Sequence, residues 1–368
     1  MPYSYDEMHR ELRWLVDNAR HVQIDRERLP AVAESIRRAL AQDATKQTDP
    51  DPMQSPPQND RDTLQFYLVL CSQEHLIWRR TAENKVEAWN ITIDGRRYTG
   101  GRGIAAAHMR ALLRGVPLLD AGYLASMTLA DVEAFYRDEA TGETDLQMLP
   151  QRLAKFNEIG RVLQKQFGGR SGGHVANLLR ETGGRLWADD GCGLVQQLLS
   201  HFPIAFYDWP FNKLANLYGK FIAMRNLADV PSSDEFLELS QIHDPQHFEI
   251  AADYYIPLFF IRTGVFRIDD ELARCLRERR LIARNSRMEL EYRACTMIAG
   301  RELAALSGLP VPVVDEEVWR SGFTRCRLCT PQATDEELPC PHRELSVAYQ
   351  QEHDLMELGW PLVMTTCY

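Results

Sequence analysis

Residues 249–272 read EIAADYYIPLFFIRTGVFRIDDEL, and this stretch decides the predicted fold. It places one carboxylate, Asp253, beside the most apolar run of the chain. Pro257 suits the first turn of a helix and Gly264 suits its end. Asp269 is a good N-cap for a second helix that runs to about residue 280. The stretch therefore predicts two helices joined by a tight hairpin.

Two interpretations of Asp253 stay open on this pattern. An aspartate shortly before a helix that begins with proline more often only caps that helix. Alternatively, the apolar residues Phe259, Phe260, Val265 and Phe266 form a poorly solvated wall behind it. A carboxylate against such a wall can stabilise a positive charge that develops during catalysis.

The composition narrows the function classes. The chain has 368 residues, 45% of them hydrophobic, and a formal charge of -10. An acidic chain lacks the basic face that a general nucleic-acid or membrane-surface binder needs, so we expect no membrane and no stable nucleic-acid partner. No stretch approaches the roughly 20 apolar residues of a membrane span, and the N-terminal residues lack the apolar segment of a signal peptide. We therefore expect a cytoplasmic, globular protein whose cysteines are reduced.

Helical periodicity dominates the chain, and strand character is confined to a short part of it. The apolar pattern predicts helices within residues 5–41 (two helices), 104–114, 128–137, 149–167, 175–180, 193–200, 214–227, 232–236 and 288–306. Residues 64–78 and 88–93 have strand character, and Asp94-Gly95 predicts a hairpin turn with Tyr98 on the returning strand. The predicted fold class is mainly α with one small antiparallel β-sheet (α+β), in a single globular domain over residues 1–368.

Two segments differ from this pattern. Residues 43–62 are poor in apolar side chains and rich in Pro and Asp, which predicts a mobile loop. Residues 321–345 form a Cys/His-rich insertion in which Cys326, Cys329, Cys340 and His342 have the spacing C-x2-C-x10-C-x-H. This spacing is compatible with a structural zinc site, although four such residues can also lie together by chance. A catalytic zinc is disfavoured, because all four ligands would come from the protein.

Several motifs occur in an order that resembles one family. They are NARHVQID, LPAVAESI, GRRYTG, AAAHMRALLRGVPLLDAGYLASMTLADV, FGG, HFP, ADYYIPLFFIRTGVF, LEYRACTMIAGREL and DEEVW. In this order they resemble the queuosine salvage proteins, over roughly residues 14–319. The resemblance implies a fold similar to helix-hairpin-helix DNA glycosylases. It also implies hydrolysis of the N-glycosidic bond of queuosine 5'-monophosphate, which releases queuine for tRNA modification.

The resemblance also implies roles for particular residues. Cleavage of an N-glycosidic bond builds positive charge on the ribose, and Asp253 suits the carboxylate beneath it. Asp315 or Asp208 would pair with the ammonium of queuine, and Lys220 would bind the phosphate. The aromatic residues expected to contact the substrate or offer stacking planes are Trp319, Tyr98, Tyr254, Phe206 and Trp209.

The chain departs from the family pattern at a few positions. Glu74 and His75 stand where the family usually has Asn-Phe, and Tyr255 follows ADY in place of Arg. After YTG, where the family usually has an aromatic residue, this chain has Gly101, Arg102 and Gly103. Two alternatives from other classes stay open. A DNA-repair-type glycosylase would use the same hairpin and Asp253, and a zinc-bearing, non-enzymatic binding module would depend on the cysteines. The expected partner is a small-molecule nucleotide, with no cofactor for catalysis and a possible structural zinc.

Overall fold

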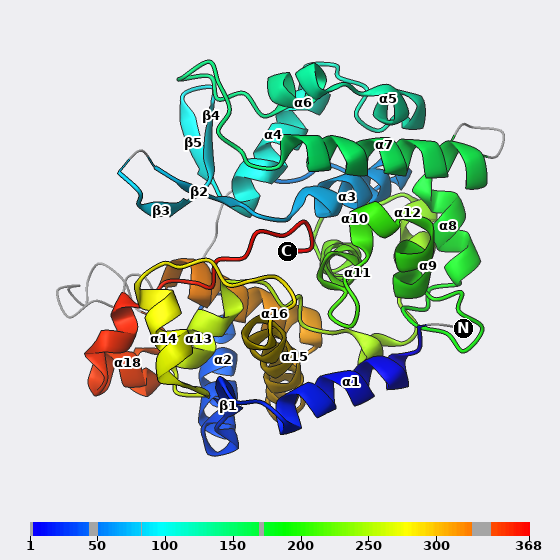
Figure 1. The fold of residues 1–368 in the computed structure, drawn as a ribbon. Helices are drawn as coiled ribbons and strands as arrows, with labels where there is room; N and C mark the ends of the chain where they lie inside the picture. Colours follow the sequence, from blue (N-terminus) through cyan, green and yellow to red (C-terminus); the bar gives the residue numbers. More distant parts are fainter. Residues whose placement is uncertain (1–2, 44–50, 82, 169–172, 326–339) are drawn as a thin grey trace.

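The structure is a computed structural model that describes residues 3–43, 51–81, 83–168, 173–325 and 340–368. The described residues are mainly helical, with short strands between some of the helices (Figure 1). The helices of the first half are α1 Tyr5–Asp17, α2 Leu29–Asp43, α3 Arg61–Gln73, α4 Gly101–Leu113, α5 Ala121–Ser126, α6 Leu129–Phe135, α7 Leu149–Gln166 and α8 Val175–Thr182. Those of the second half are α9 Leu194–His201, α10 Pro203–Phe206, α11 Lys213–Asn226, α12 Asp234–Leu239, α13 Ile256–Arg262, α14 Asp270–Arg277, α15 Arg287–Ser307, α16 Val311–Arg320 and α18 Val347–Gln350.

Within the described residues the strands form three separate ribbons, so the prediction of one sheet was wrong. Each ribbon has two antiparallel strands. The pairs are β1 Val22–Ile24 with β6 Phe266–Ile268, β2 Trp78–Arg80 with β3 Val86–Ala88, and β4 Asn90–Ile93 with β5 Arg96–Thr99. The Asp94-Gly95 turn between β4 and β5 is confirmed, since both residues have positive φ, as a type I' turn requires. The missed β1–β6 ribbon joins residues more than 200 positions apart, which local periodicity cannot reveal.

The strand predicted over residues 64–78 is a helix for most of its length. Asp60 and Thr63 form a capping box that starts α3, and residues 63–73 are all buried. Because this helix is buried on every face, it has no exposed polar face and lacks the period of 3.6 that distinguishes a surface helix from a buried strand. By contrast, the predicted capping box of Thr128 and Asp131 at the start of α6 is confirmed.

The stretch that decided the predicted fold forms α13, β6 and α14. Pro257 lies in the first turn of α13, Gly264 follows its end with φ +75°, and the Asp269 side chain accepts a hydrogen bond from the Leu272 amide at the start of α14. Both helices are therefore confirmed. The connection is not a hairpin alone, because β6 lies within it and pairs with β1.

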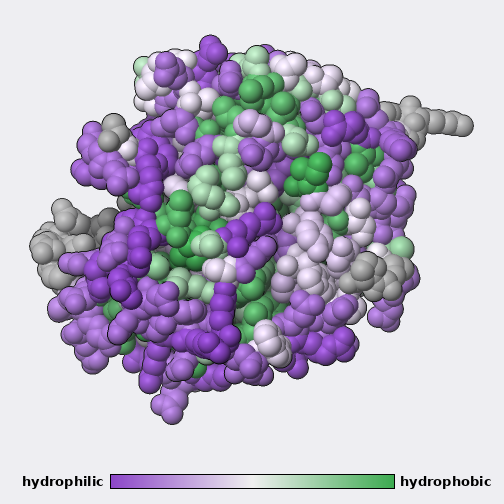
Figure 2. All heavy atoms as spheres, in the orientation of Figure 1, coloured by the Kyte–Doolittle hydropathy of each residue, from purple (hydrophilic) through white to green (hydrophobic). Residues whose placement is uncertain are grey.

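Two apolar clusters lie on either side of the middle of the molecule. One gathers side chains of α1, of the segment from α3 to α12 and of one face of α15. The other gathers those of α2, α13, α16, residues 358–368 and another face of α15. Residues 360–368 run between the upper and lower parts of Figure 1. The Tyr368 carbonyl accepts from the Leu76 amide at 2.9 Å, and the Leu362 carbonyl accepts from the Ile282 amide at 2.8 Å. On the face drawn in Figure 2, hydrophobic residues show through in the middle, within a mostly hydrophilic periphery.

Part of the loop predicted over residues 43–62 is attached to α11. Residues 44–50 lie outside the described residues. Beyond them, Arg225 donates from Nε to Asn59 Oδ1 at 2.6 Å and from Nη1 to Ser55 Oγ at 3.2 Å. The loop thereby brings Gln54 to the wall of the cavity described below.

In the described part of the chain, no single helix combines the length and the apolar character that a membrane crossing needs. The segments Arg287–Ser307 and Val311–Phe323 meet that criterion only as a pair, which is bent by 115°.

Candidate active site

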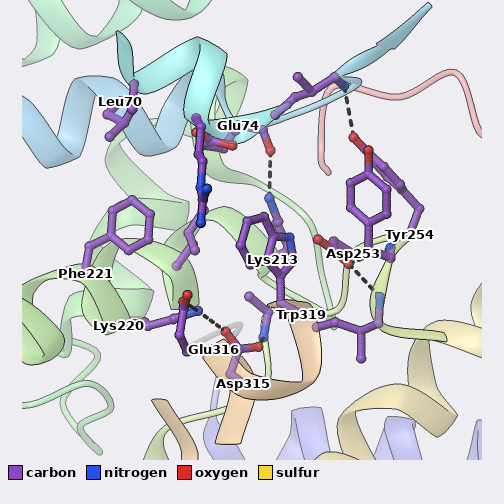
Figure 3. A pocket seen from close by; sticks show the side chains of 18 of the residues that line it. Leu70, Glu74, Lys213, Lys220, Phe221, Asp253, Tyr254, Asp315, Glu316 and Trp319 are labelled. Atoms are coloured by element: carbon purple, nitrogen blue, oxygen red, sulfur yellow. Dashed lines mark hydrogen bonds and ion pairs between the residues drawn. The ribbon is translucent and has the colours of Figure 1, made fainter. Parts of the chain in front are cut away.

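A cavity of about 250 Å³ lies where the two apolar clusters meet. Its walls come from α3, α4, α11, residues 251–256 and α16 (Figure 3). The charged residues on these walls are Glu74, Arg102, Lys213, Lys220, Asp253, Asp315 and Glu316. Four carboxyl groups and three cationic groups therefore share one small space.

Asp253 is both a helix cap and a wall of the cavity. Its Oδ1 accepts hydrogen bonds from the amides of Tyr255 at 2.8 Å and Ile256 at 3.0 Å, at the start of α13. Asp253 is only 7% exposed. Phe259 and Phe260 of α13 are fully buried in the apolar cluster that also contains α2, α15 and α16. Burial raises the pKa of Asp253 to about 6, although Lys213 and the two amides act in the opposite direction.

One end of the cavity holds a closed ion-pair cluster. Lys220 Nζ lies 2.5 Å from Asp315 Oδ2 and 2.9 Å from Glu316 Oε2. Burial alone would lower the pKa of Lys220, but the two carboxylates outweigh it and raise that pKa above its ordinary value. Asp315 Oδ1 also accepts from the Ala251 amide at 2.9 Å. Asp315 thus connects α11 and α16 to the segment that carries Asp253.

The other end holds Lys213, which lies two helical turns before Lys220 on the same face of α11. Lys213 Nζ donates to the main-chain carbonyl of Glu74 at 2.7 Å (Figure 3). Among the described residues it forms no ion pair within 4 Å with a carboxylate. Burial lowers the pKa of Lys213, and the same cause raises the pKa of the Glu74 carboxyl to about 7.

The turn that carries Glu74 is held by a second buried cation. Arg152 of α7 donates to the carbonyls of Gln73 at 2.7 Å and His75 at 2.7 Å. Leu76 follows with φ +45°, a conformation that is uncommon for a residue with a side chain. Two buried cations, Arg152 and Lys213, therefore fix the backbone on either side of the Glu74 side chain.

Of the nine residues that were predicted to act in catalysis, substrate contact or stacking, five line this cavity: Asp253, Tyr254, Lys220, Asp315 and Trp319. They come from α11, the turn before α13 and α16, which are distant in sequence. The Tyr254 hydroxyl accepts from the Ile77 amide at 3.2 Å, so this residue also attaches the Asp253 segment to the strand that follows Glu74.

The structure does not place Asp208, Tyr98, Phe206 or Trp209 on this cavity wall. Asp208 forms a two-fold salt bridge with Arg293, whose Nη1 and Nη2 lie 2.9 Å and 2.5 Å from its carboxylate oxygens. This pair is buried, so its charge is already compensated inside the fold. Tyr98 packs in the core beside α4, with the Arg96 guanidinium over its ring.

Several residues of the wall were not predicted, among them Lys213 and Glu316, and Arg102 and Glu74 were noted only as departures from the family pattern. Lys213 precedes Lys220 by seven positions, which is two turns of a helix, so the two lysines share one face of α11. That spacing was a readable signal. Glu74 gave no such signal, because the helix that ends just before it was predicted as a strand.

The predicted zinc ligands are only partly within the described residues. Cys326 and Cys329 lie outside them. Cys340 and His342 are buried. His342 Nδ1 lies 2.8 Å from Ser35 Oγ, and its Nε2 lies 3.2 Å from Glu317 Oε1. Both ring nitrogens of His342 are therefore occupied by hydrogen bonds, and a metal would have to displace one of them.

The arrangement suits chemistry on a small molecule that becomes positively charged as it reacts. Asp253 is a buried carboxylate fixed by two amides, and its burial makes its charge effective at short range. Trp319 and Phe221 provide aromatic surfaces on the same cavity, and the Arg102 guanidinium lies at its rim. Among the described residues, the lining of this cavity contains no cysteine or histidine.

Comparison with known proteins agrees with the motif order. The model of the queuosine salvage protein family matches residues 54–306. A mouse (Mus musculus) protein named queuosine 5'-phosphate N-glycosylase/hydrolase is 24% identical over 290 residues, which are 77% of this chain and 80% of the mouse protein. A protein of the same name from Sphaerobacter thermophilus is 28% identical over 299 residues, or 79% of this chain and 83% of that protein. Because the family match covers well over half of the sequence, the chain belongs to the queuosine salvage protein family.

Proposed function

We propose that this protein hydrolyses the N-glycosidic bond of queuosine 5'-monophosphate and releases queuine and ribose 5-phosphate. The observation that carries the proposal is Asp253. This buried carboxylate lies on the cavity wall, within the ADYYIPLFFIRTGVF motif of the family, and is fixed by two amides. The names of the mouse and Sphaerobacter thermophilus relatives support the same reaction.

The reaction separates charge, and Asp253 suits the positive part. As the bond between C1' and the base nitrogen breaks, its electron pair stays with the base and the ribose becomes cationic. A preorganised carboxylate near C1' lowers the energy of this state because it needs no reorganisation at that moment. Water then adds to C1' and loses a proton, which gives ribose 5-phosphate.

The remaining wall residues suit the other parts of the substrate. We assign Trp319 and Phe221 to the planar base, since an aromatic face can stack on it. We assign Arg102 to the phosphate in place of Lys220, whose charge is already taken by Asp315 and Glu316. Arg102 also lines the cavity, and its charge helps to lower the pKa of Glu316, but in the described part of the chain it forms no ion pair within 4 Å. Asp315 then acts by holding Lys220 and the Ala251 amide in position.

The test is incubation of the purified protein with queuosine 5'-monophosphate, with mass spectrometry of free queuine. We expect queuine and ribose 5-phosphate in equal amounts. We also expect Arg102→Ala to raise the KM for the monophosphate while leaving hydrolysis of the unphosphorylated nucleoside unchanged. Absence of queuine at micromolar enzyme, beside a relative that releases it in the same assay, would refute the proposed function.

Two finer features stay predictions. A structural zinc at Cys326, Cys329, Cys340 and His342 rests on their spacing, and elemental analysis of protein purified without added metal tests it. A zinc content far below one equivalent would contradict it. Likeness to helix-hairpin-helix DNA glycosylases rests on the resemblance, and α13 and α14 are the helices to superpose.

A further inference from the structure

We propose that Glu74 is a second catalytic carboxyl group, which holds a proton on the cavity wall and donates it to the departing base while Asp253 stays ionised. This inference rests on the proposed function, because it names the acid for that same bond cleavage. It concerns a residue that the motifs of the chain do not single out, on the wall of the cavity reached from α3 (Figure 3).

The first support is the fixed position of Glu74. Its carbonyl is bound by Lys213 Nζ at 2.7 Å, and the carbonyls of Gln73 and His75 are bound by Arg152. The Glu74 side chain is only 8% exposed. A Cβ at Gly101 would lie 2.9 Å from Glu74 Oε2, so the carboxyl group fills the space left by that glycine at the start of α4. General acids act well only when their position is set in this way.

The second support is an asymmetry between the two carboxyl groups. Asp253 accepts hydrogen bonds from the amides of Tyr255 and Ile256, and such bonds favour the ionised form. Among the described residues, no hydrogen bond reaches the Glu74 carboxylate oxygens, and burial disfavours its ionised form. Since two negative charges in one small cavity repel each other, the single charge resides on Asp253 and the proton on Glu74.

The surrounding charges agree with this assignment. The pKa is about 6 for Asp253 and about 7 for Glu74, so near neutral pH the pair is occupied by one proton for much of the time. The start of α4 favours an anion at Glu74 and acts in the opposite sense. The groups that interact with the Glu74 charge come from five parts of the fold: Lys213 and Lys220 of α11, Arg152 of α7, Asp253 and Tyr254 before α13, Cys71 of α3, and Tyr136 after α6.

The chemistry balances with these two groups and one water. The bond between C1' and the base nitrogen breaks, its electron pair goes to the base, and the Glu74 proton neutralises the base anion. Water forms the new bond to C1', and its second proton passes to solvent. Glu74 then recovers a proton from solvent, so the enzyme returns to its starting state.

The test compares wild type with Glu74→Gln over pH 5–9. For wild type we expect kcat/KM to fall above about pH 7, where Glu74 ionises, and below about pH 6, where Asp253 gains a proton. For Glu74→Gln we expect kcat/KM to be lower by roughly 10²-fold or more, as for loss of a general acid. We also expect kcat/KM of this variant to show no decline on the alkaline side. Glu74→Asp should keep the alkaline decline, because it keeps an acid.

A substrate with a stable leaving anion separates catalysis from a structural role. On 4-nitrophenyl ribofuranoside 5-phosphate, whose leaving group needs no proton, we expect Glu74→Gln to retain most of the wild-type rate. A merely structural role would lower both rates equally. Glu158→Gln is the matched control, since Glu158 is also buried but lies outside the cavity, where it accepts from the amides of Ile204 and Ala205. We expect it to behave as wild type.

The outcomes distinguish the two proposals. If wild type releases no queuine, the proposed function fails. If wild type releases queuine and Glu74→Gln keeps its rate or its alkaline decline, only the assignment of Glu74 fails. If Glu74→Gln changes KM alone, Glu74 binds the substrate as an anion and the acid role is overturned.

Discussion

The two ends of the cavity have the same components in different arrangements. Each has one lysine of α11 and two carboxyl groups nearby. At one end, Lys220 Nζ lies within 3 Å of oxygens of both Asp315 and Glu316. At the other, Lys213 Nζ bonds the main chain of Glu74, and its charge acts on Glu74 and Asp253 without a direct ion pair.

The difference separates structural from chemical use of buried charge. Direct pairing with Lys220 engages the carboxyl groups of Asp315 and Glu316 and joins α11 to α16. The carboxyl groups near Lys213 lack such pairing, so their burial is only partly compensated and their pKa values are raised to about 7 and about 6. A carboxyl group that titrates near neutral pH can exchange protons during a reaction.

The largest expected effect is on stability at the paired end. Lys220→Met leaves Asp315 buried without its cation, which typically costs about 3–5 kcal/mol of unfolding free energy. Urea denaturation at pH 7 measures it. Lys165→Met, at an exposed position on α7, is the control and should change stability little. A loss below about 1 kcal/mol for Lys220→Met would mean that this pair is not what holds the two helices together.

The next effect is on the reaction at the unpaired end. Asp253→Asn keeps an oxygen for the Tyr255 and Ile256 amides but removes the charge, and loss of one preorganised electrostatic group typically lowers kcat by roughly 10²-fold to 10³-fold. Single-turnover release of queuine measures it. Asp269→Asn is the matched control, because Asp269 also caps a helix but lies outside the cavity.

Asp253→Asn should also change the pH dependence of the unfolding free energy. Because the folded-state pKa of Asp253 is raised to about 6, ionisation of this group destabilises the fold, and that cost grows as pH rises from about 4 to about 6. Asp253→Asn removes the cost, so its unfolding free energy at pH 7 should equal or exceed that of wild type. A variant that is both inactive and clearly less stable would point to a capping role instead.

A smaller effect tests how Lys213 acts without an ion pair. Its charge lowers the pKa values of Asp253 and Glu74, so Lys213→Met should raise both. The acid side of the kcat/KM profile should then move upward by roughly one pH unit, which is about tenfold in rate at pH 5. The variant also leaves the Glu74 carbonyl without its donor, at a cost of about 1–3 kcal/mol. An unchanged acid side would show that Lys213 only holds the backbone.

Much of the fold was predictable where the signals are local. Caps and turn residues located α6, α13, α14 and the β4–β5 hairpin, since each depends on contacts within a few positions. The predictions failed where tertiary contacts decide. α3 is buried all round and therefore has no helical period, and the β1–β6 ribbon depends on residues far apart in the chain.

The site residues likewise divide into those that the sequence predicted and those that depend on tertiary contacts. Asp253, Asp315 and Trp319 were predicted because motifs carry them, and Lys220 was predicted from the family resemblance alone. The fold brings all four to one cavity. Glu74 could not be assigned to the cavity, because its place depends on Arg152 of α7 and Lys213 of α11 binding the backbone around it. Asp208 shows the converse. Asp208 lies in an aromatic, motif-like turn, yet in the fold its carboxylate forms a buried ion pair with Arg293.

The smallest expected effect concerns Tyr98, which sequence analysis placed at the substrate. Its side chain belongs to the core beside α4 and not to the cavity lining. Tyr98→Phe keeps the ring and removes only the hydroxyl, so kcat/KM for queuosine 5'-monophosphate should stay within about twofold of wild type.

Tyr254→Phe is the informative comparison, because the Tyr254 hydroxyl accepts from the Ile77 amide at 3.2 Å and ties the Asp253 segment to the strand beyond Glu74. Loss of this hydroxyl should lower the unfolding free energy by about 1 kcal/mol. It should also lower kcat/KM more than Tyr98→Phe does, since both carboxyl groups lie next to that contact. If Tyr98→Phe instead proved the more damaging of the two, the substrate would have to reach past Gly101 to β5, and the cavity described here would be only part of the site.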